Sequence, residues 1–419
     1  MTTSGVDTIS NLPSNILDGI LGCLPLKDAV KTSILSKDWR YKWVTRQKLD
    51  FDGKFLMSFK DIQVAKTIIY QVLLLHKGPI LKFTLQGPNV TSCPDISHWI
   101  LFLSEKNVQE FTLHIFSGNE YHLPSQIFTF QQLWHLELGR CLFHPPPDFK
   151  GFEKLINLDL QCVIFDPAII RNLISKCPLL ERLRLNWCTD FDIFEIDAAN
   201  LKCFDFVGIS KSICFKNTPM LRNVTVWLDS NVLTDPSPIY SNITKFFHYM
   251  PSLRELDLCG STLEYLTMGG VPESPPTALN NVGSLRISSM YFRNAEEVSG
   301  AVYLITSCPK LQELTIECET VGTVVEPVMQ FLRAQSVSCG VVKLLQSVQM
   351  CYFTGFEMEM EFMKFILACA PVLEEIFIWN VAQYFHRGTK MMDEIKQFCR
   401  VSPNVRFKFE EAFIDPELP

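Results

Sequence analysis

The sequence predicts a mixed α/β protein, in which a short three-helix unit precedes a solenoid with a curved, largely parallel sheet and helices on its convex side. Three observations predict this fold. The chain has 419 residues, of which 47% are hydrophobic and 20% charged, enough apolar material for a packed core. Helical patterns crowd residues 12–43. From residue 80 onward, one strand-like phrase recurs every 20 to 34 residues.

The first helix is expected to begin at Pro13, where the missing N–H loses no hydrogen bond, and to end before Pro25. Between these prolines, apolar residues recur at spacings of three and four, the pattern of one helical face. The apolar residues are Leu12, Ile16, Leu17, Ile20, Leu21 and Leu24. The segment therefore predicts an amphipathic helix.

Two more helices are expected in this unit. The second runs from about residue 26 to residue 35, and its inward residues are expected to be Ala29, Val30, Ile34 and Leu35. Ser36 offers an N-cap for a third helix, which carries Trp39 and Trp43 on one face. So small a unit buries too little surface to be stable alone. Its remaining apolar surface either binds a partner or caps the repeats behind it, and periodicity alone leaves both open.

The same segment resembles an F-box. The usual form has a Leu-Pro start, an Ile-Leu pair one turn on, a second Leu-Pro, and an ending of the type Leu-Ser-x-x-Trp-Arg-x-x-Trp. The matching residues are Leu12-Pro13, Ile16-Leu17, Ile20-Leu21, Leu24-Pro25, Asp28-Ala29-Val30, Thr32-Ser33, Leu35-Ser36, Trp39-Arg40 and Trp43. Asn15 departs from the family, which usually carries an acid there, so a favourable charge at the helix N-terminus is lost.

This resemblance implies a partner. F-box proteins dock on the Skp-type adaptor of a Skp–cullin–F-box (SCF) ubiquitin ligase, and through the adaptor they reach a cullin. The residues that the resemblance places against the adaptor are Leu12, Pro13, Ile16, Leu17, Ile20, Leu24, Pro25, Val30 and Leu35.

The recurring phrase is apolar-x-x-apolar-x-apolar, whose centre is a short strand with alternate side chains inward. Its spacing fits leucine-rich repeats, and the longer steps imply insertions. Clear copies start at Leu133, Leu155, Leu180, Leu253, Leu311 and Leu373. Looser copies start at Ile80, Val108, Leu201, Leu221, Val282 and Leu345. An ordinary α/β fold with similarly spaced strands is the alternative, and twelve starts disfavour it.

Helices are expected to return the chain between strands. The four expected return helices are Pro167–Cys177, Asn242–Met250, Val298–Cys308 and Glu359–Cys369. After each of them comes a proline, separated from the next start by one residue, which stops the helix before the strand begins. The cysteines that follow two of the strands, Cys141 and Cys188, are expected to pack in the core.

The last stretch resembles the FBD region of plant F-box/FBD/LRR-repeat proteins. The matching items are Phe353-x-Gly355, Ala370-Pro371-x-Leu373-Glu374, and Arg400-x-Ser402-Pro403 before a final apolar strand. Since a repeat stack needs its last apolar edge covered, this region is expected to act as a cap. The expected divisions are an F-box at 1–50, a linker and N-terminal cap helix at 51–79, leucine-rich repeats at 80–340, and the FBD region with the C-terminal cap at 341–412.

Alternation within the strands also selects the residues that face away from the core. They are His135, Glu137, Asn157, Asp159, Arg182, Arg184, Asp205, Thr225, Trp227, Glu255, Asp257, Glu313, Thr315, Glu317, Phe377 and Trp379. Exposed aromatic residues and arginines are the usual binding anchors, so Arg184, Trp227 and Trp379 are expected to contact a target protein. Acidic residues outnumber basic ones in this set, which favours a target with a basic patch.

Several functions are disfavoured by what the sequence lacks. It has no phosphate-binding glycine loop and no nucleophile elbow. Its 15 cysteines form no CxxC pair, so neither a zinc site nor any cofactor is expected. The net charge of −7 argues against nucleic acid as a partner. The polar N-terminus and the absence of any run of about 18–20 apolar residues predict no membrane segment, and hence a nuclear or cytoplasmic protein.

The sequence thus predicts a non-catalytic substrate-recognition subunit of an SCF ubiquitin ligase, which binds a Skp-type adaptor through its head and an unidentified target protein through its repeats. The alternative is an adaptor-bound or stand-alone repeat scaffold without a ligase function. The sequence leaves open whether a small-molecule co-ligand is needed.

Overall fold

The computed structural model describes residues 13–35, 39, 41–88, 90–229, 243–268, 270–319, 324–335, 342–381 and 385–412. The chain divides into two compact units, residues 1–189 and 190–419, which are called unit 1 and unit 2 below. Both are mixed α/β with largely parallel sheets, so the predicted fold class is confirmed. Leu12, Ser36 and Asn242, which carried parts of the predictions above, lie outside the described residues.

Unit 1 begins with a helical head. Its elements are α1 (Ser14–Cys23), α2 (Leu26–Lys31) and the 3-10 turns η1 (Thr32–Ile34) and η2 (Lys42–Thr45). Pro13 and Pro25 immediately precede α1 and α2 with φ near −52° and −54°, values that a proline ring imposes and a helix accepts. The first predicted helix is confirmed and the second is shorter than expected. In place of the third helix, the described residues show only the η2 turn.

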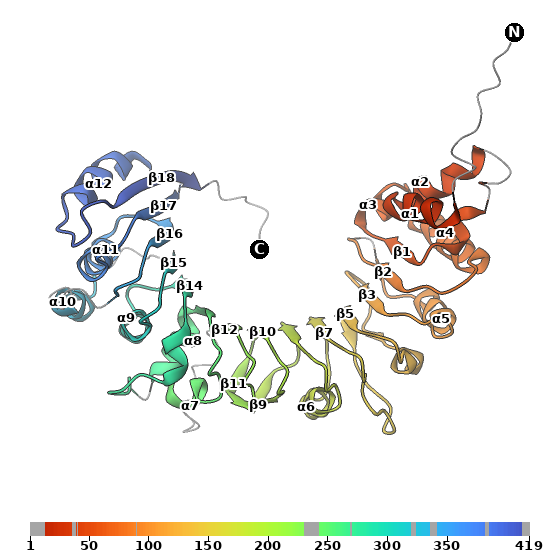
Figure 1. Ribbon diagram of the computed structural model, residues 1–419, viewed down its shortest axis with the longest axis horizontal. Coiled ribbons are helices and arrows are strands. Elements are labelled where there is room, and N and C mark those ends of the chain that lie inside the picture. Colours follow the sequence, from red (N-terminus) through yellow and green to blue (C-terminus); the bar gives the residue numbers. More distant parts are fainter. Residues whose placement is uncertain are drawn as a thin grey trace, which may run out of the picture. The chain divides into compact units, whose positions relative to one another are not determined.

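The sheet of unit 1 is parallel throughout. In spatial order its strands are β1 (Lys48–Phe51), β2 (Lys82–Leu85), β3 (Glu110–His114), β5 (His135–Gly139), β7 (Asn157–Gln161) and β8 (Arg182–Asn186). The segments between them contain α3 (Gly53–Met57), α4 (Ile62–Leu75), α5 (Pro94–Leu103), η3 (Ser125–Thr129) and α6 (Pro167–Ser175). A separate small sheet pairs β4 (Tyr121–His122) with β6 (Cys141–Leu142). Helices such as α5 and α6 lie on one face of the main sheet (Figure 1).

Unit 2 repeats the same plan. Its main sheet has the order β10 (Cys203–Gly208), β12 (Asn223–Leu228), β13 (Glu255–Cys259), β14 (Ser284–Met290), β15 (Glu313–Cys318), β16 (Ser347–Phe353), β17 (Glu375–Val381) and β18 (Arg406–Ala412). Its helical elements are α7 (Ile243–Phe247), α8 (Gly260–Thr267), η5 (Thr277–Asn281), α9 (Ala295–Ser307), α10 (Glu326–Gln335), α11 (Glu357–Cys369) and α12 (Phe385–Gln397). A second small parallel sheet pairs β9 (Phe191–Asp197) with β11 (Ser210–Lys216). Helices such as α9, α10 and α11 lie on one face of the main sheet (Figure 1).

The repeat prediction is confirmed strand by strand. Each of the twelve predicted starts stands two residues ahead of a strand, as Leu133 does before β5 and Leu373 before β17. These start residues are all buried, and so are the alternate residues inside each strand. The core of each unit therefore lies between the sheet and its helices. The residues that alternate with the buried ones face away from the core.

The predicted return helices are confirmed with shifted ends. Helix α9 begins three residues earlier than expected, because the Asn294 side chain accepts hydrogen bonds from the backbone N–H groups of Glu296 and Glu297. Asp166 caps α6 in the same way. Strand β1, the pair β9–β11 and helices α5, α8 and α10 were not predicted. Helix α8, for example, follows β13 directly, with no residue between the two elements.

Of the two cysteines predicted in the core, Cys141 lies there and Cys188 is only partly buried. Cys141 is buried, and burial raises the pKa of its thiol. Cys188 is half-buried, its Sγ donates to the Leu160 carbonyl at 3.3 Å, and burial raises its pKa to about 12. Thiols held in this protonated form are poor nucleophiles.

Candidate functional site

The head presents apolar side chains to solvent on one side and buries others on the opposite side. In α1, Leu17 and Leu21 are each 2% exposed, whereas Ile16 and Ile20 are 46% and 40% exposed. In and just after η1, Ile34 and Leu35 are 86% and 66% exposed. A helix this amphipathic normally buries its apolar stripe against another element. Here the exposed stripe is left uncovered by the described part of the chain.

The opposite side of the head packs onto the start of the sheet. Helix α1 contacts η2, and α2 contacts β1. The residues buried on this side include Leu26, Ala29, Trp39, Trp43 and Val44. The head therefore caps the first strand of unit 1 with one side while its other side stays open.

The positions expected to contact an adaptor divide into four groups. Pro13, Ile16, Ile20, Pro25 and Leu35 are exposed, and Leu24 and Val30 are half-buried. Leu17 lies in the core of unit 1, so its side chain offers no surface to a partner. Leu12 lies outside the described residues.

The inward placement expected for Ile34 and Leu35 is wrong. The α-helix ends at Lys31, and the chain continues as a 3-10 turn with about three residues per turn instead of 3.6. Ile34 and Leu35 lie beyond the last α-helical turn, and their side chains are exposed to solvent. The head thereby gains its most exposed apolar residues.

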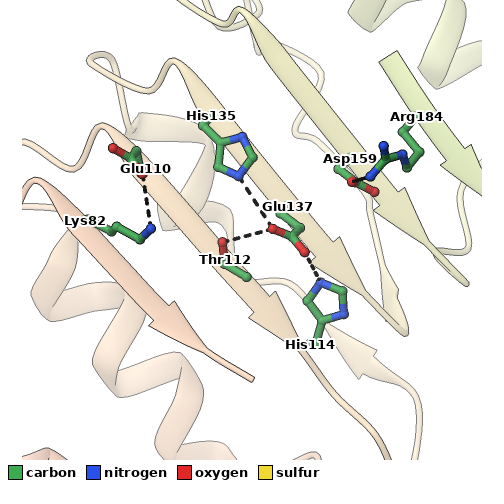
Figure 2. Close-up of polar contacts among 8 residues, drawn as sticks. All are labelled: Lys82, Glu110, Thr112, His114, His135, Glu137, Asp159 and Arg184. Atoms are coloured by element: carbon green, nitrogen blue, oxygen red, sulfur yellow. Dashed lines mark hydrogen bonds and ion pairs between the residues drawn. The ribbon is translucent and has the colours of Figure 1, made fainter. Parts of the chain in front are cut away.

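The sheet face opposite the helices, called here the open face, carries a ladder of polar contacts in unit 1. Figure 2 shows Glu137 of β5 held between side chains of two strands. Its carboxylate contacts His114 Nε2 at 2.8 Å and His135 Nε2 at 3.5 Å, and it accepts a hydrogen bond from Thr112 Oγ1 at 3.3 Å. These contacts from His114 and His135 lower the pKa of Glu137, although burial opposes them.

Two ion pairs flank this cluster on the open face of unit 1 (Figure 2). Lys82 Nζ lies 3.4 Å from a Glu110 carboxylate oxygen, and Arg184 lies 2.9 Å from Asp159 Oδ2. Burial raises the pKa of Asp159, while Arg184 opposes the rise. The guanidinium of Arg184, predicted to anchor a target, is thus already engaged by a carboxylate of the neighbouring strand.

The open face of unit 2 carries a different network, centred on Asp257 of β13. Trp227 donates its indole N–H to Asp257 Oδ1 at 2.9 Å, and Arg286 Nε lies 3.9 Å from Asp257 Oδ2. Arg286 also forms an ion pair with Glu317. Burial raises the pKa of Asp257 to about 6 despite these partners. Sequence analysis missed Arg286, although the alternation that selected Asp257 also places Arg286 on this face.

Aromatic residues lie toward the C-terminal strands of the same face. Lys408 Nζ of β18 lies 4.3 Å from the ring centroid of Phe377 and 3.0 Å from a Glu375 carboxylate oxygen. Trp379, the third predicted anchor, is 37% exposed, whereas the predicted anchor Trp227 is half-buried. Trp379 therefore offers more free surface to a partner than Trp227 does.

A hollow of about 580 Å³ opens at the N-terminal edge of the strands in unit 2. Glu255 and Glu313 line it from the open face, and Arg222, Arg254 and Lys310 line it from the preceding turns. Arg254, Gly283 and Gln312 each stand one residue ahead of three neighbouring strands, β13, β14 and β15 respectively. Because the middle residue, Gly283, has no side chain, the space stays open. The lining carries both signs of charge, so the hollow by itself selects no ligand.

The described ranges of the chain show neither a cluster of metal ligands nor a membrane-spanning helix. No group of three or more His, Cys, Asp or Glu side chains is arranged there to hold a metal ion. Within the same ranges, no helix combines the length and the apolar character that crossing a membrane requires.

Comparison with known proteins agrees with this architecture. Residues 9–49 match the F-box domain, and residues 96–316 match the family described as "FBD-associated F-box protein At5g56370, LRR repeats". F-box/FBD/LRR-repeat protein At1g13570 of Arabidopsis thaliana is 34% identical over 96% of this chain and 98% of its own length. The putative FBD-associated F-box protein At3g50710 of the same plant is 25% identical over 95% of this chain and 98% of its own length.

The fold and the two matched regions define a leucine-rich-repeat protein with an N-terminal F-box. The chain belongs to the plant F-box/FBD/LRR-repeat family, as its sequence motifs predicted. These domains indicate a substrate-recognition adaptor that works through protein–protein interaction, and the names of its relatives point to non-catalytic interaction proteins.

Proposed function

We propose that this protein is the substrate-recognition subunit of an SCF ubiquitin ligase in the nucleus or cytoplasm. Its head binds a Skp-type adaptor, and through it a cullin, while its repeats hold a target protein. Catalysis belongs to the other subunits and to a ubiquitin-conjugating enzyme. The chain contributes proximity, because a tethered target presents its lysines at a high effective concentration.

The observation that carries this proposal is the uncovered apolar side of the head. Ile16, Ile20, Ile34 and Leu35 all point away from the core of unit 1. Burying one such side chain in an interface contributes about 1.5–3 kcal/mol, so four together are enough to anchor a partner. The opposite side of the head is fixed to β1, which holds this surface in place.

The test is retention of a Skp-type adaptor by the tagged full-length chain after co-expression. We expect the variant Ile34→Asp/Leu35→Asp to retain at least about tenfold less adaptor, because it places two charges in an apolar interface. Both residues are exposed, so the variant should fold. The matched control is Leu101→Asp/Leu179→Asp, which changes two exposed leucines outside the head and should retain the adaptor fully.

Two results would contradict the proposal. If Ile34→Asp/Leu35→Asp retained the adaptor as well as the unaltered chain does, the head would not be the docking surface. If the unaltered chain retained the adaptor but never the cullin, the protein would be an adaptor-bound scaffold and not a ligase subunit.

A further inference from the structure

The open faces of the two units differ in charge. In unit 1 the charged residues on this face balance, four against four: Asp50, Glu110, Glu137 and Asp159 against Lys48, Lys82, Arg182 and Arg184. In unit 2 seven carboxylates face three cationic groups: Asp205, Glu255, Asp257, Glu313, Glu317, Glu375 and Glu410 against Arg286, Arg406 and Lys408. The acidic excess of the repeats is therefore concentrated on the open face of unit 2.

The three cationic groups of this face are already engaged. Arg286 pairs with Glu317 and lies beside Asp257, while Lys408 and Arg406 lie 3.0 Å and 4.0 Å from Glu375. Glu313 and Glu410 are exposed and form no ion pair with any residue that the structure describes. The face thus keeps a surplus of negative charge that its own side chains do not neutralise.

One row of side chains across this face combines carboxylates with an aromatic ring. Strand register aligns Glu317 of β15, Cys351 of β16, Trp379 of β17 and Glu410 of β18. Neighbouring strands lie about 4.8 Å apart, so Glu410 is adjacent to Trp379 and Glu317 is about 10 Å from it. Cys351 has a short side chain, which leaves room above the row between Glu317 and the indole.

This part of the face already accommodates a cation over an aromatic ring. Lys408 Nζ lies above Phe377, one row away from Trp379, and is also paired with Glu375. An indole attracts a cation more strongly than a phenyl ring does, and the attraction increases when a carboxylate lies nearby. Trp379 likewise has a carboxylate beside it, that of Glu410, but neither of its neighbours in the row, Cys351 and Glu410, supplies a cation.

We propose that the open face of unit 2 binds a basic segment of the target protein, with a Lys or Arg side chain seated over Trp379 beside Glu410. This inference rests on the proposed role of the repeats as the target-binding region, and it specifies the chemistry of the target. Electrostatic complementarity of this kind sets partner choice and association rate more than raw affinity.

The test uses the full-length chain and a fluorescent nine-residue oligo-arginine peptide, with an oligo-glutamate peptide of equal length for comparison. Binding is followed by fluorescence anisotropy at physiological salt, where charges separated by more than about 8 Å are largely screened. We expect saturable binding of oligo-arginine and none of oligo-glutamate. Both Glu313→Lys/Glu410→Lys and Trp379→Ala should weaken binding about tenfold.

Each variant has a matched control. Glu153→Lys/Glu394→Lys changes the net charge of the chain equally, at exposed positions off this face, and Trp187→Ala removes an exposed tryptophan of unit 1. Both controls should bind oligo-arginine within about twofold of the unaltered chain. The inference would be overturned if a control weakened binding as much as its partner variant does. It would also be overturned if oligo-arginine showed no saturable binding. No adaptor is present in this assay, so its failure is distinguishable from failure of the adaptor test.

Discussion

Replacing Glu359 with alanine is expected to lower the free energy of unfolding of the segment around α11 by about 3–5 kcal/mol. The Glu359 side chain is fully buried and accepts hydrogen bonds from the backbone N–H groups of Thr354 and Gly355, both at 2.8 Å. The Thr354 hydroxyl also donates to it, at 3.0 Å. Leaving such buried donors without an acceptor costs about 1–3 kcal/mol each.

The backbone at Gly355, one of these donors, has a φ of +75°, a conformation that glycine adopts readily. Glu359 therefore holds a sharp turn between β16 and α11. This turn contains Phe353-x-Gly355, the motif that resembles the FBD region. The structure thus supplies a physical role for that motif: it fixes α11 against the strands whose open face carries Phe377 and Trp379.

Native-state hydrogen exchange of peptides from α11 measures this prediction, because local opening is read there directly. Glu359→Gln keeps an acceptor oxygen and should lose about half as much stability as the alanine variant. The matched control is Glu357→Ala, two residues earlier and exposed, which should change protection by less than about 0.5 kcal/mol. Similar losses of protection in Glu357→Ala and Glu359→Ala would show that the buried hydrogen bonds are not the cause.

The second large effect concerns pH. Glu297 of α9 is 3% exposed, and burial raises its pKa to about 7 although the Tyr291 backbone N–H donates to its Oε2 at 2.7 Å. A carboxyl whose pKa is raised on folding stabilises the folded state fully below its unfolded value of 4.5. That stabilisation is lost as the pH rises through about 7. The shift corresponds to about 3 kcal/mol.

We therefore expect Glu297→Gln, which cannot ionise, to gain about 3 kcal/mol in unfolding free energy relative to the unaltered chain between pH 4.5 and pH 8. Urea unfolding at a series of pH values measures this difference. Other groups with shifted pKa values, such as Asp257 and Glu137, are present in both proteins and cancel. The control Glu296→Gln removes the exposed neighbouring carboxyl and should not reproduce the gain of about 3 kcal/mol. A difference between Glu297→Gln and the unaltered chain that did not grow as the pH rises would disprove the assignment.

Much of the repeat region could be predicted because its pattern is local. Alternation within five or six residues marks a strand, and a proline two residues before a start ends the preceding helix. These rules located the starts of twelve strands. They missed β1 and the β9–β11 pair, which lie outside the recurring phrase, and α8, which follows β13 without an intervening residue.

The site was only partly predictable, because burial and pairing depend on residues far apart in the chain. Leu17 and Ile16 were both predicted as adaptor contacts, yet α1 packs on η2, and Leu17 is buried while Ile16 is exposed. Likewise Arg184 and Trp227 were predicted as free anchors. Strand register places Asp159 beside Arg184 and Asp257 beside Trp227, 25 and 30 residues away in sequence.

The sequence alone thus determined the class of fold, the strand positions and the F-box motif, since each follows from the spacing of residues within one short segment. Tertiary structure alone decided which apolar residues of the head stay uncovered, which charged residues neutralise one another, and which open face keeps a negative surplus. Those properties arise between segments, where register and packing bring together side chains that local periodicity cannot relate.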